Sequence, residues 1–147
     1  MDMRQITSTF FAAPQISPED MPDIAAAGIK RILCNRPDAE VPPSHHCAHM
    51  QAAAEAAGLE FVVQPLTHQT MTPDVIAANR QLIDTCNGPV LAYCASGTRS
   101  TIAWALAAAQ DMPVERVIEA ARTGGYDLRN LQPTLMAVAA MARDGNG

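Results

Sequence analysis

Short apolar runs alternate along this chain with longer segments that mix polar and apolar residues. The apolar runs are bounded by glycine, proline or polar residues, which is typical of buried strands in a parallel sheet. Two of the longer segments open on Ser17-Pro18-Glu19 and Thr72-Pro73-Asp74, where a hydroxyl can cap a helix whose first turn contains proline. The pattern predicts strands at 9–12, 29–34, 59–64 and 89–93, and helices at 17–27, 44–57, 72–86, 101–110, 114–122 and 133–143.

The alternation of strands and helices indicates an α/β fold, with a mainly parallel sheet covered by helices. The strand at 9–12 is expected at an edge of this sheet. No linker, repeat or low-complexity tract divides residues 1–147, so they are expected to form a single domain. The helix that follows Thr72 is expected to pack through one face, made by Val75, Asn79, Leu82 and Cys86.

Composition narrows the class of protein. The chain has 147 residues, of which 48% are hydrophobic, and a net charge of −5 without a basic cluster. This charge argues against nucleic acid or an anionic membrane surface as the main partner. There is no apolar run at the amino terminus typical of a signal peptide, and no apolar segment long enough to cross a bilayer. A cytoplasmic protein is therefore expected.

The cysteines and histidines suggest no metal site. No two of the four cysteines have the CxxC spacing of a zinc knuckle, and no disulfide framework is indicated. His45 and His49 lie one helical turn apart, but no further ligand is evident, so a solvated helix start is the simpler interpretation. Neither a metal nor an organic cofactor is expected.

The segment from Cys94 to Ser100 carries the strongest chemical signal. It lies between the apolar strand at 89–93 and an alanine-rich helix, so its backbone N–H groups can converge on an anion at a helix N-terminus. The same partial positive charge favours the thiolate form of Cys94. Arg99 adds a planar fork that can hold two oxygens of a phosphate-like group. The pattern indicates a nucleophile beside an anion cradle.

Cys94-x5-Arg99-Ser100 resembles the phosphate-binding loop of the cysteine-dependent tyrosine and dual-specificity phosphatases. Three further segments, 28–40, 56–65 and 124–128, are similar to a bacterial phosphatase-like family that occurs alone or fused to a β-lactamase-like, persulfide-dioxygenase-type domain. The resemblance covers nearly the whole chain. It implies the compact cysteine-phosphatase fold, with a central sheet of four or five strands flanked by helices.

The resemblance also implies roles for individual residues. Cys94 would attack phosphorus and form a thiophosphate intermediate, while Arg99 would hold two oxygens of the phosphoryl group. Ser100 would donate a hydrogen bond to the sulfur. The cradle around the phosphate would be formed by Ala95, Ser96, Gly97, Thr98 and Arg99.

Two positions depart from the phosphatase pattern. Tyr93 stands where the residue before the nucleophile is usually histidine, and the loop at 65–70, where the acidic proton donor usually lies, contains no carboxylate. His68 falls about where that acid belongs and can donate a proton near neutral pH, although it can equally be a surface loop residue. Asp74 is better explained as part of a helix start.

Three functions therefore remain open. The first is hydrolysis of a phosphomonoester, on a phosphorylated small molecule or a phosphoprotein. The second is sulfur transfer, because the loop also looks like that of single-domain rhodaneses, in which the cysteine carries a persulfide and no general acid is needed. The chain lacks the usual opening of those proteins. The third is a non-catalytic module that binds an anion or a protein.

Cys34 is a candidate redox partner of Cys94. It ends a strand expected to lie beside the one that leads to Cys94, and in some lipid-phosphatase relatives a cysteine at that place forms a reversible disulfide with the nucleophile. The alternative is a small buried residue at a strand end. Arg36 and Asp38 follow in the next loop and could border the pocket.

Overall fold

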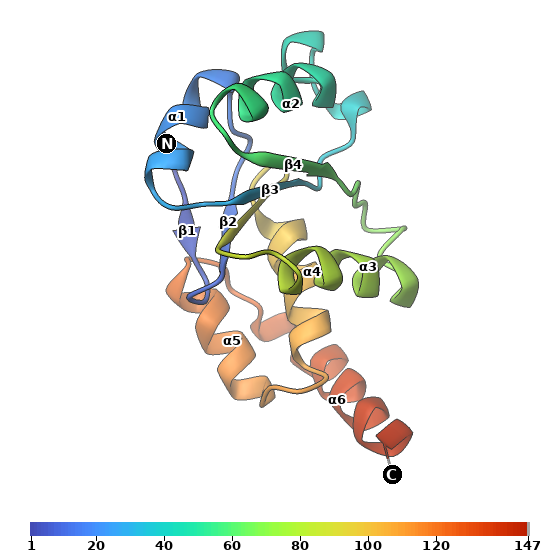
Figure 1. Ribbon diagram of the computed structural model, residues 1–147. Coiled ribbons are helices and arrows are strands. Elements are labelled where there is room, and N and C mark those ends of the chain that lie inside the picture. The colour runs from blue at the N-terminus through green and yellow to red at the C-terminus, as the bar shows by residue number, and fades with distance from the viewer. Residues whose placement is uncertain (147) are drawn as a thin grey trace.

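A five-stranded sheet forms the centre of the protein (Figure 1). The structure is a computed structural model that describes residues 1–146, with side chains described to residue 144. The strands follow the order β1-β2-β5-β3-β4 across the sheet, and only β1 runs antiparallel to its neighbour. They are β1 (Arg4–Gln5), β2 (Phe10–Ala13), β3 (Arg31–Cys34), β4 (Glu60–Val63) and β5 (Val90–Tyr93).

Strand β5 lies in the middle of the sheet and ends next to the candidate loop. It pairs in parallel with β2 on one side and β3 on the other, so that Ala13, Cys34 and Tyr93 lie in register at the carboxyl edge. In an open parallel sheet this edge is where ligands bind. The expected place of Cys94, directly after a central strand, is confirmed.

The edge position predicted for the first strand is wrong. Strand β2 is internal because Arg4 and Gln5 form the antiparallel strand β1 beside it. The hydrophobic pattern could not reveal β1, since it is two residues long and both are polar.

Helices cover both faces of the sheet (Figure 1). Helices α1 and α2 share one core cluster with the sheet, and α4, α5 and α6 share another on the opposite face, with α3 against α4. None of the helices in the described part of the chain is both long and apolar enough to cross a membrane. Their bounds are α1 (Met21–Ala26), α2 (Cys47–Ala56), α3 (Pro73–Asp84), α4 (Thr98–Ala108), α5 (Val114–Thr123) and α6 (Gln132–Asn146).

The predicted inner face of α3 is displaced by about one residue. Its buried residues are Ile76, Asn79 and Ile83, whereas Val75 and Leu82 are only partly buried. Thr72 caps the helix as predicted, accepting a hydrogen bond from the Val75 N–H. Helix α4 begins at Thr98, earlier than predicted, because Gly97 ends the loop.

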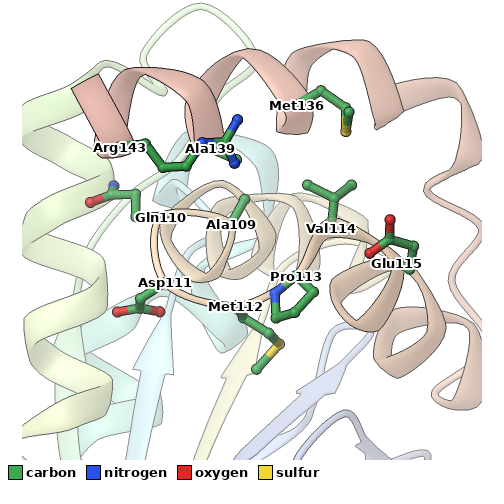
Figure 2. Close-up of a pocket in the computed structure, with 10 residues that line it drawn as sticks. All are labelled: Ala109, Gln110, Asp111, Met112, Pro113, Val114, Glu115, Met136, Ala139 and Arg143. Carbon is green, nitrogen blue, oxygen red and sulfur yellow. The ribbon is translucent and has the colours of Figure 1, made fainter. Parts of the chain in front are cut away.

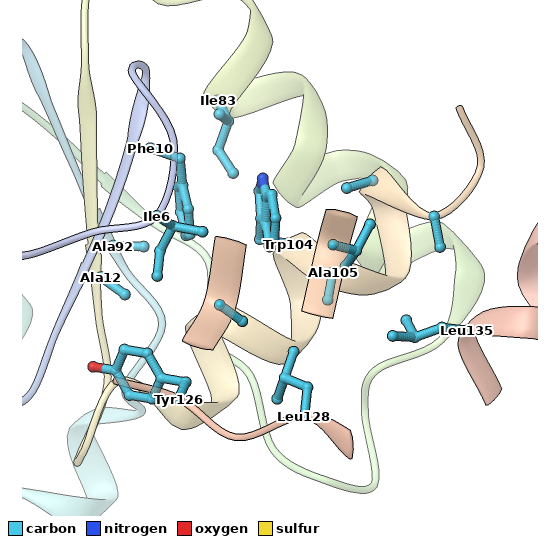
Figure 3. Close-up of a cluster of buried hydrophobic side chains, with 14 of the residues drawn as sticks. Ile6, Phe10, Ala12, Ile83, Ala92, Trp104, Ala105, Tyr126, Leu128 and Leu135 are labelled. Carbon is cyan, nitrogen blue, oxygen red and sulfur yellow. The ribbon is translucent and has the colours of Figure 1, made fainter. Parts of the chain in front are cut away.

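The core on the α4 side is built around an aromatic pair (Figure 3). The Trp104 ring stacks on Phe10 with ring centroids 5.8 Å apart, and Trp104 is 8% exposed. Such offset pairs contribute about 1 kcal/mol beyond the burial of their area. The prediction that Trp104 belongs to the core is confirmed.

Candidate functional site

The loop from Cys94 to Gly97 connects β5 to α4 and turns sharply at Gly97. This glycine has φ of 94°, in the left-handed region that favours glycine. A side chain there would overlap the Tyr126 hydroxyl. That hydroxyl donates a hydrogen bond of 3.0 Å to the Ser96 carbonyl. The turn after α5 therefore helps to fix the conformation of the loop. Sequence reasoning identified the 124–128 segment by resemblance and gave it no role.

Cys94 lies at the base of the loop, 1% exposed. Its Sγ accepts a hydrogen bond of 3.1 Å from the Gly97 N–H. The N-terminus of α4 starts at the next residue, so its partial positive charge acts on the same sulfur. Both the amide and the helix N-terminus are therefore oriented to interact favourably with negative charge at the loop.

Arg99 is held by a two-point ion pair with Glu40. Its Nη1 and Nη2 atoms donate to the two carboxylate oxygens at 2.8 and 2.7 Å, and Nη1 also donates to the Leu66 carbonyl at 2.8 Å. The Glu40 hydrogen bonds raise the pKa of Arg99, and the nearby Cys94 sulfur adds to this effect. A guanidinium has five N–H groups. Three are used here, and within the described residues no oxygen or nitrogen atom accepts from Nε–H or from the second Nη2 hydrogen. One edge of the fork therefore remains for two oxygens of an anion.

Glu40 is a residue of the candidate site to which the sequence pattern gave no role. It lies in a short 3-10 turn, Asp38–Glu40, after β3, and its carboxylate also accepts from Arg36 Nε at 3.3 Å. The side chain of Glu40 is 33% exposed, and the Arg99 hydrogen bond lowers its pKa. The strand pattern placed the end of β3 beside that of β5, so it indicated that the loops after them meet at one edge, but it did not indicate which side chains pair there.

The ion pair predicts a pH dependence of stability. A carboxyl whose pKa is lower in the folded protein stabilises it above the unfolded pKa, and this stabilisation is lost as the pH falls through the folded value. We therefore expect the free energy of unfolding of the native protein to exceed that of Glu40→Gln near pH 7. The difference should shrink once the pH falls below about 4.3, the ordinary pKa of glutamate. Urea titrations at several pH values measure this, and a difference that stays constant from pH 7 to pH 3 would contradict it.

Ser100 belongs to a buried polar network instead of contacting the sulfur. Its hydroxyl donates to Asn35 Oδ1 at 2.8 Å, and Asn35 Nδ2 donates to Asn79 Oδ1 at 3.0 Å. All three side chains are fully buried. The hydrogen bond from Ser100 to Cys94 that the resemblance implied is therefore not the one in this structure, because the fixed amide oxygen of Asn35 takes the hydroxyl proton.

A pocket of about 440 Å³ opens over the loop. Part of its wall comes from the loop that follows β4, including His68. His68 and Arg99 are thus brought to one cavity, as expected of a proton donor beside an anion site, although its role as acid stays a prediction. Asp74 lies in the first turn of α3, consistent with a helix start. The lining residues are Glu40, Thr67, His68, Gln69, Ala95, Ser96, Thr98 and Arg99.

The sulfur of Cys34 lies against that of Cys47. Their Sγ atoms are 3.5 Å apart, and both cysteines are free. The predicted pairing of Cys34 with Cys94 stays a prediction. Of the two loop residues expected near the pocket, Arg36 supports Glu40, and Asp38 accepts a 2.8 Å hydrogen bond from the Cys47 N–H. Across the described residues, no three His, Cys, Asp or Glu side chains are grouped so that they could hold a metal ion.

A second cavity, of about 400 Å³, lies at the other end of α4 (Figure 2). It is bounded by the segment 109–115 and by Met136, Ala139 and Arg143 of α6. An 11-residue helix separates it from the loop, a length of roughly 16 Å. The C-terminal end of a helix carries partial negative charge and disfavours anions. The pocket lined by Ala95, Ser96, Thr98 and Arg99 is therefore the better candidate for the chemistry.

Comparison with known proteins identifies the family of this chain. Residues 2–111 match the family model described as "Beta-lactamase hydrolase-like protein, phosphatase-like domain". A beta-lactamase hydrolase-like protein from Agrobacterium fabrum is 34% identical over 122 residues, which are 82% of this chain and 28% of that protein. The chain spans less than a third of the length of the curated relatives it matches.

Solved structures give the same result. A candidate phosphatase from Neisseria meningitidis is 35% identical, with a TM-score of 0.83 over 94% of this chain and 99% of that one. The core catalytic domain of a PP-IP phosphatase from S. cerevisiae shares the fold, with a TM-score of 0.68 at 14% identity over 99% of this chain and 93% of that one. The cysteine-phosphatase fold expected from the loop is confirmed. The chain belongs to the family of phosphatase-like domains of beta-lactamase hydrolase-like proteins.

Proposed function

We propose that this protein is a cysteine-dependent phosphatase that hydrolyses a phosphomonoester, on a phosphorylated small molecule or a phosphoprotein. The observation that carries the proposal is the arrangement at the head of α4. There the Cys94 sulfur accepts an amide hydrogen bond, and Arg99 keeps one edge of its guanidinium unpaired among the described residues. A thiolate and a fork for two oxygens are the minimum for phosphoryl transfer to sulfur.

In the first step the Cys94 thiolate attacks phosphorus. A sulfur–phosphorus bond forms and the bond to the leaving oxygen breaks, and the electron pair of that bond goes to the oxygen. Arg99 and the loop amides hold the remaining phosphoryl oxygens and stabilise their charge in the transition state. Because Glu40 fixes the guanidinium from the other edge, this stabilisation requires little reorganisation during the reaction.

In the second step a water molecule attacks the phosphorus of the thiophosphate. The sulfur–phosphorus bond breaks, the electron pair returns to Cys94, and inorganic phosphate is released. The helix N-terminus and the Gly97 N–H stabilise the sulfur as it leaves. The water must lose a proton, and the group that gave a proton to the leaving oxygen in the first step can take it.

We assign that proton transfer to His68, which lines the pocket beside Arg99. Positioned acids and bases contribute about 10²–10⁴ in rate, and the contribution is largest when the leaving group is a poor one. His68→Ala is expected to slow hydrolysis of an alkyl phosphate about a hundredfold, and that of p-nitrophenyl phosphate much less. Gln69→Ala, at the next position of the same loop, is the matched control. Equal slowing of both substrates would remove His68 as the proton donor.

A direct test of the proposed function is to look for the covalent intermediate. The protein is mixed with p-nitrophenyl phosphate, quenched in acid within milliseconds, and the peptide that contains Cys94 is examined by mass spectrometry. A phosphorylated cysteine together with steady release of phosphate is expected. Folded protein that releases no phosphate, or that releases it without passing through phosphorylated Cys94, would overturn the proposal.

A second candidate is sulfur transfer, favoured by one observation about the pocket. Glu40 is the only carboxylate among the described residues that line it, and Glu40 is committed to Arg99. A reaction that needs no acid would suit such a pocket. Cys94 would take the outer sulfur of thiosulfate, releasing sulfite, and cyanide would remove it as thiocyanate. Thiocyanate formation, with Cys94 heavier by one sulfur atom, would favour this candidate. Failure of both assays by folded protein would favour a binding module.

A further inference from the structure

The thiols of Cys34 and Cys47 lie in contact, at the two ends of the segment that contains Glu40. The proposed phosphatase chemistry uses neither of them. The Cys34 and Cys47 Sγ atoms are 3.5 Å apart, and neither cysteine is in a disulfide. Cys34 ends β3 and is 2% exposed, whereas Cys47 opens α2 and is partly buried. A disulfide has its sulfurs about 2.05 Å apart, so the two side chains need to approach by roughly 1.5 Å.

A buried hydroxyl lies beside the pair. Tyr93 is directly opposite Cys34 in the β3–β5 register and is 1% exposed. Its hydroxyl has no hydrogen-bond partner by distance and angle in the part of the chain described. Burial raises the pKa of Tyr93, and the nearby Cys34 thiol raises it further. The hydroxyl therefore stays protonated, and it can donate to a Cys34 sulfur that becomes negative.

The charged and titratable groups around Cys47 control how fast it reacts. Asp38 accepts the Cys47 N–H hydrogen bond, His46 precedes the helix, and Cys34 and Tyr93 lie on the sheet side. Burial, Cys34 and Asp38 together raise the pKa of the Cys47 thiol. A thiol with a raised pKa is a slow nucleophile at neutral pH, but once oxidised it forms a disulfide that is hard to reduce.

We propose that Cys34 and Cys47 are a dithiol–disulfide site, separate from Cys94 and oxidised by peroxide. Cys47, the more exposed of the two, attacks hydrogen peroxide as a thiolate. The O–O bond breaks, a sulfenic acid forms, and the second oxygen leaves as water with the thiol proton. The Cys34 sulfur then attacks the sulfenic sulfur. The S–S bond forms and the S–O bond breaks, and hydroxide leaves as water with the Cys34 proton. Each sulfur loses one electron and peroxide is reduced to two waters.

The Cys34–Cys47 disulfide would link the two ends of the segment that contains Glu40, the residue paired with Arg99. This segment begins after Cys34 and ends before Cys47, and its Asp38 already holds the start of α2. A disulfide across a loop of this length stabilises chiefly by restricting the unfolded chain. It would also occupy Cys34, so that Cys34 could not pair with Cys94.

The experiment uses the 147-residue protein with Cys94→Ser, which removes the thiol that could compete for Cys34. After treatment with hydrogen peroxide, free thiols are alkylated and the chain is cleaved at Asp38 and Glu40, which separates Cys34 from Cys47. We expect linked Cys34 and Cys47 peptides that part on reduction, formed about tenfold faster per unit of pH between 7 and 9. The oxidised protein should also melt several degrees higher. Cys86→Ser in the same background is the control that should behave identically.

Two results would overturn the proposal. One is that Cys34 and Cys47 both remain alkylatable after oxidation of protein shown to be folded by circular dichroism. The other is that oxidation of the native protein links Cys34 to Cys94 and none to Cys47. Because both readouts are the states of cysteine side chains and not catalytic activity, neither result depends on whether the protein hydrolyses phosphate.

Discussion

Cys94→Ser is expected to lower kcat/KM for p-nitrophenyl phosphate by at least about a thousandfold. The variant keeps the size of the side chain and the Gly97 N–H hydrogen-bond donor. It replaces the sulfur, which is a strong nucleophile, by a hydroxyl oxygen, which is a weak one near neutral pH. The loop and Arg99 should still bind phosphate, so the loss should appear mainly in kcat.

The matched control for this variant is Cys86→Ser. Cys86 is a free, partly buried cysteine that follows α3 and packs against the core cluster that contains Trp104. It should keep nearly full activity. Steady-state kinetics on both proteins, with melting curves to show that they are folded, measure the difference. Activity of the Cys94 variant within tenfold of the native protein would mean that the sulfur does not attack phosphorus.

Arg99→Lys is expected to lower kcat by about 10²–10³-fold, the usual result of removing a donor aimed at developing charge. The five N–H groups of arginine serve Glu40 and Leu66 on one edge and leave the other edge unpaired among the described residues. Lysine carries three donors on a single nitrogen and cannot serve both edges. The lysine ammonium should pair with Glu40. Phosphate would then be held by the backbone amides of the loop alone, without a positively charged side chain.

Glu40→Gln separates the two edges of Arg99. It keeps the guanidinium and removes only the charge that fixes it, so it should cost less activity than Arg99→Lys. Steady-state kinetics on both variants give the loss of activity. The inhibition constant of inorganic phosphate, measured on the same two proteins, gives the affinity of each variant for the anion. Equal losses of kcat in the two variants would show that the unpaired edge of Arg99, with Nε–H and the second Nη2 hydrogen, does not bind the phosphoryl group. Activity of Arg99→Lys within tenfold of the native protein would show the same.

The framework of this domain could be predicted from its sequence because each element carries a strong local signal. The apolar runs at 29–34 and 89–93 contain β3 and β5, and the Thr72 cap starts α3 as expected. Cys94, Gly97 and Arg99 could be assigned together because they are close in the chain. Strand β1 gave no such signal, because it depends on pairing with β2 alone.

The partners of the site residues could not be predicted, because they are far apart in the sequence. Glu40 reaches Arg99 across 59 positions, and Asn35 reaches Ser100 across 65. Hydrophobic periodicity says which face of an element is buried, but not which polar groups meet there. The resemblance supplied a partner for Ser100 and one for Cys34. In the structure Ser100 donates to Asn35, and the Cys34 sulfur lies against the Arg36 carbonyl and the Cys47 sulfur.

The hydrogen bond between Tyr126 and the loop shows how far a truncated form of this domain must extend to keep the loop in place. The family match ends at residue 111, yet the hydroxyl that donates a hydrogen bond to the Ser96 carbonyl belongs to Tyr126, which lies beyond α5. A protein cut back to the matched segment would keep every residue that we propose to contact phosphate, and it would lose the Tyr126 hydrogen bond to the loop. Anyone trimming this domain for expression or for fusion to another enzyme should therefore cut no earlier than the turn that follows Tyr126.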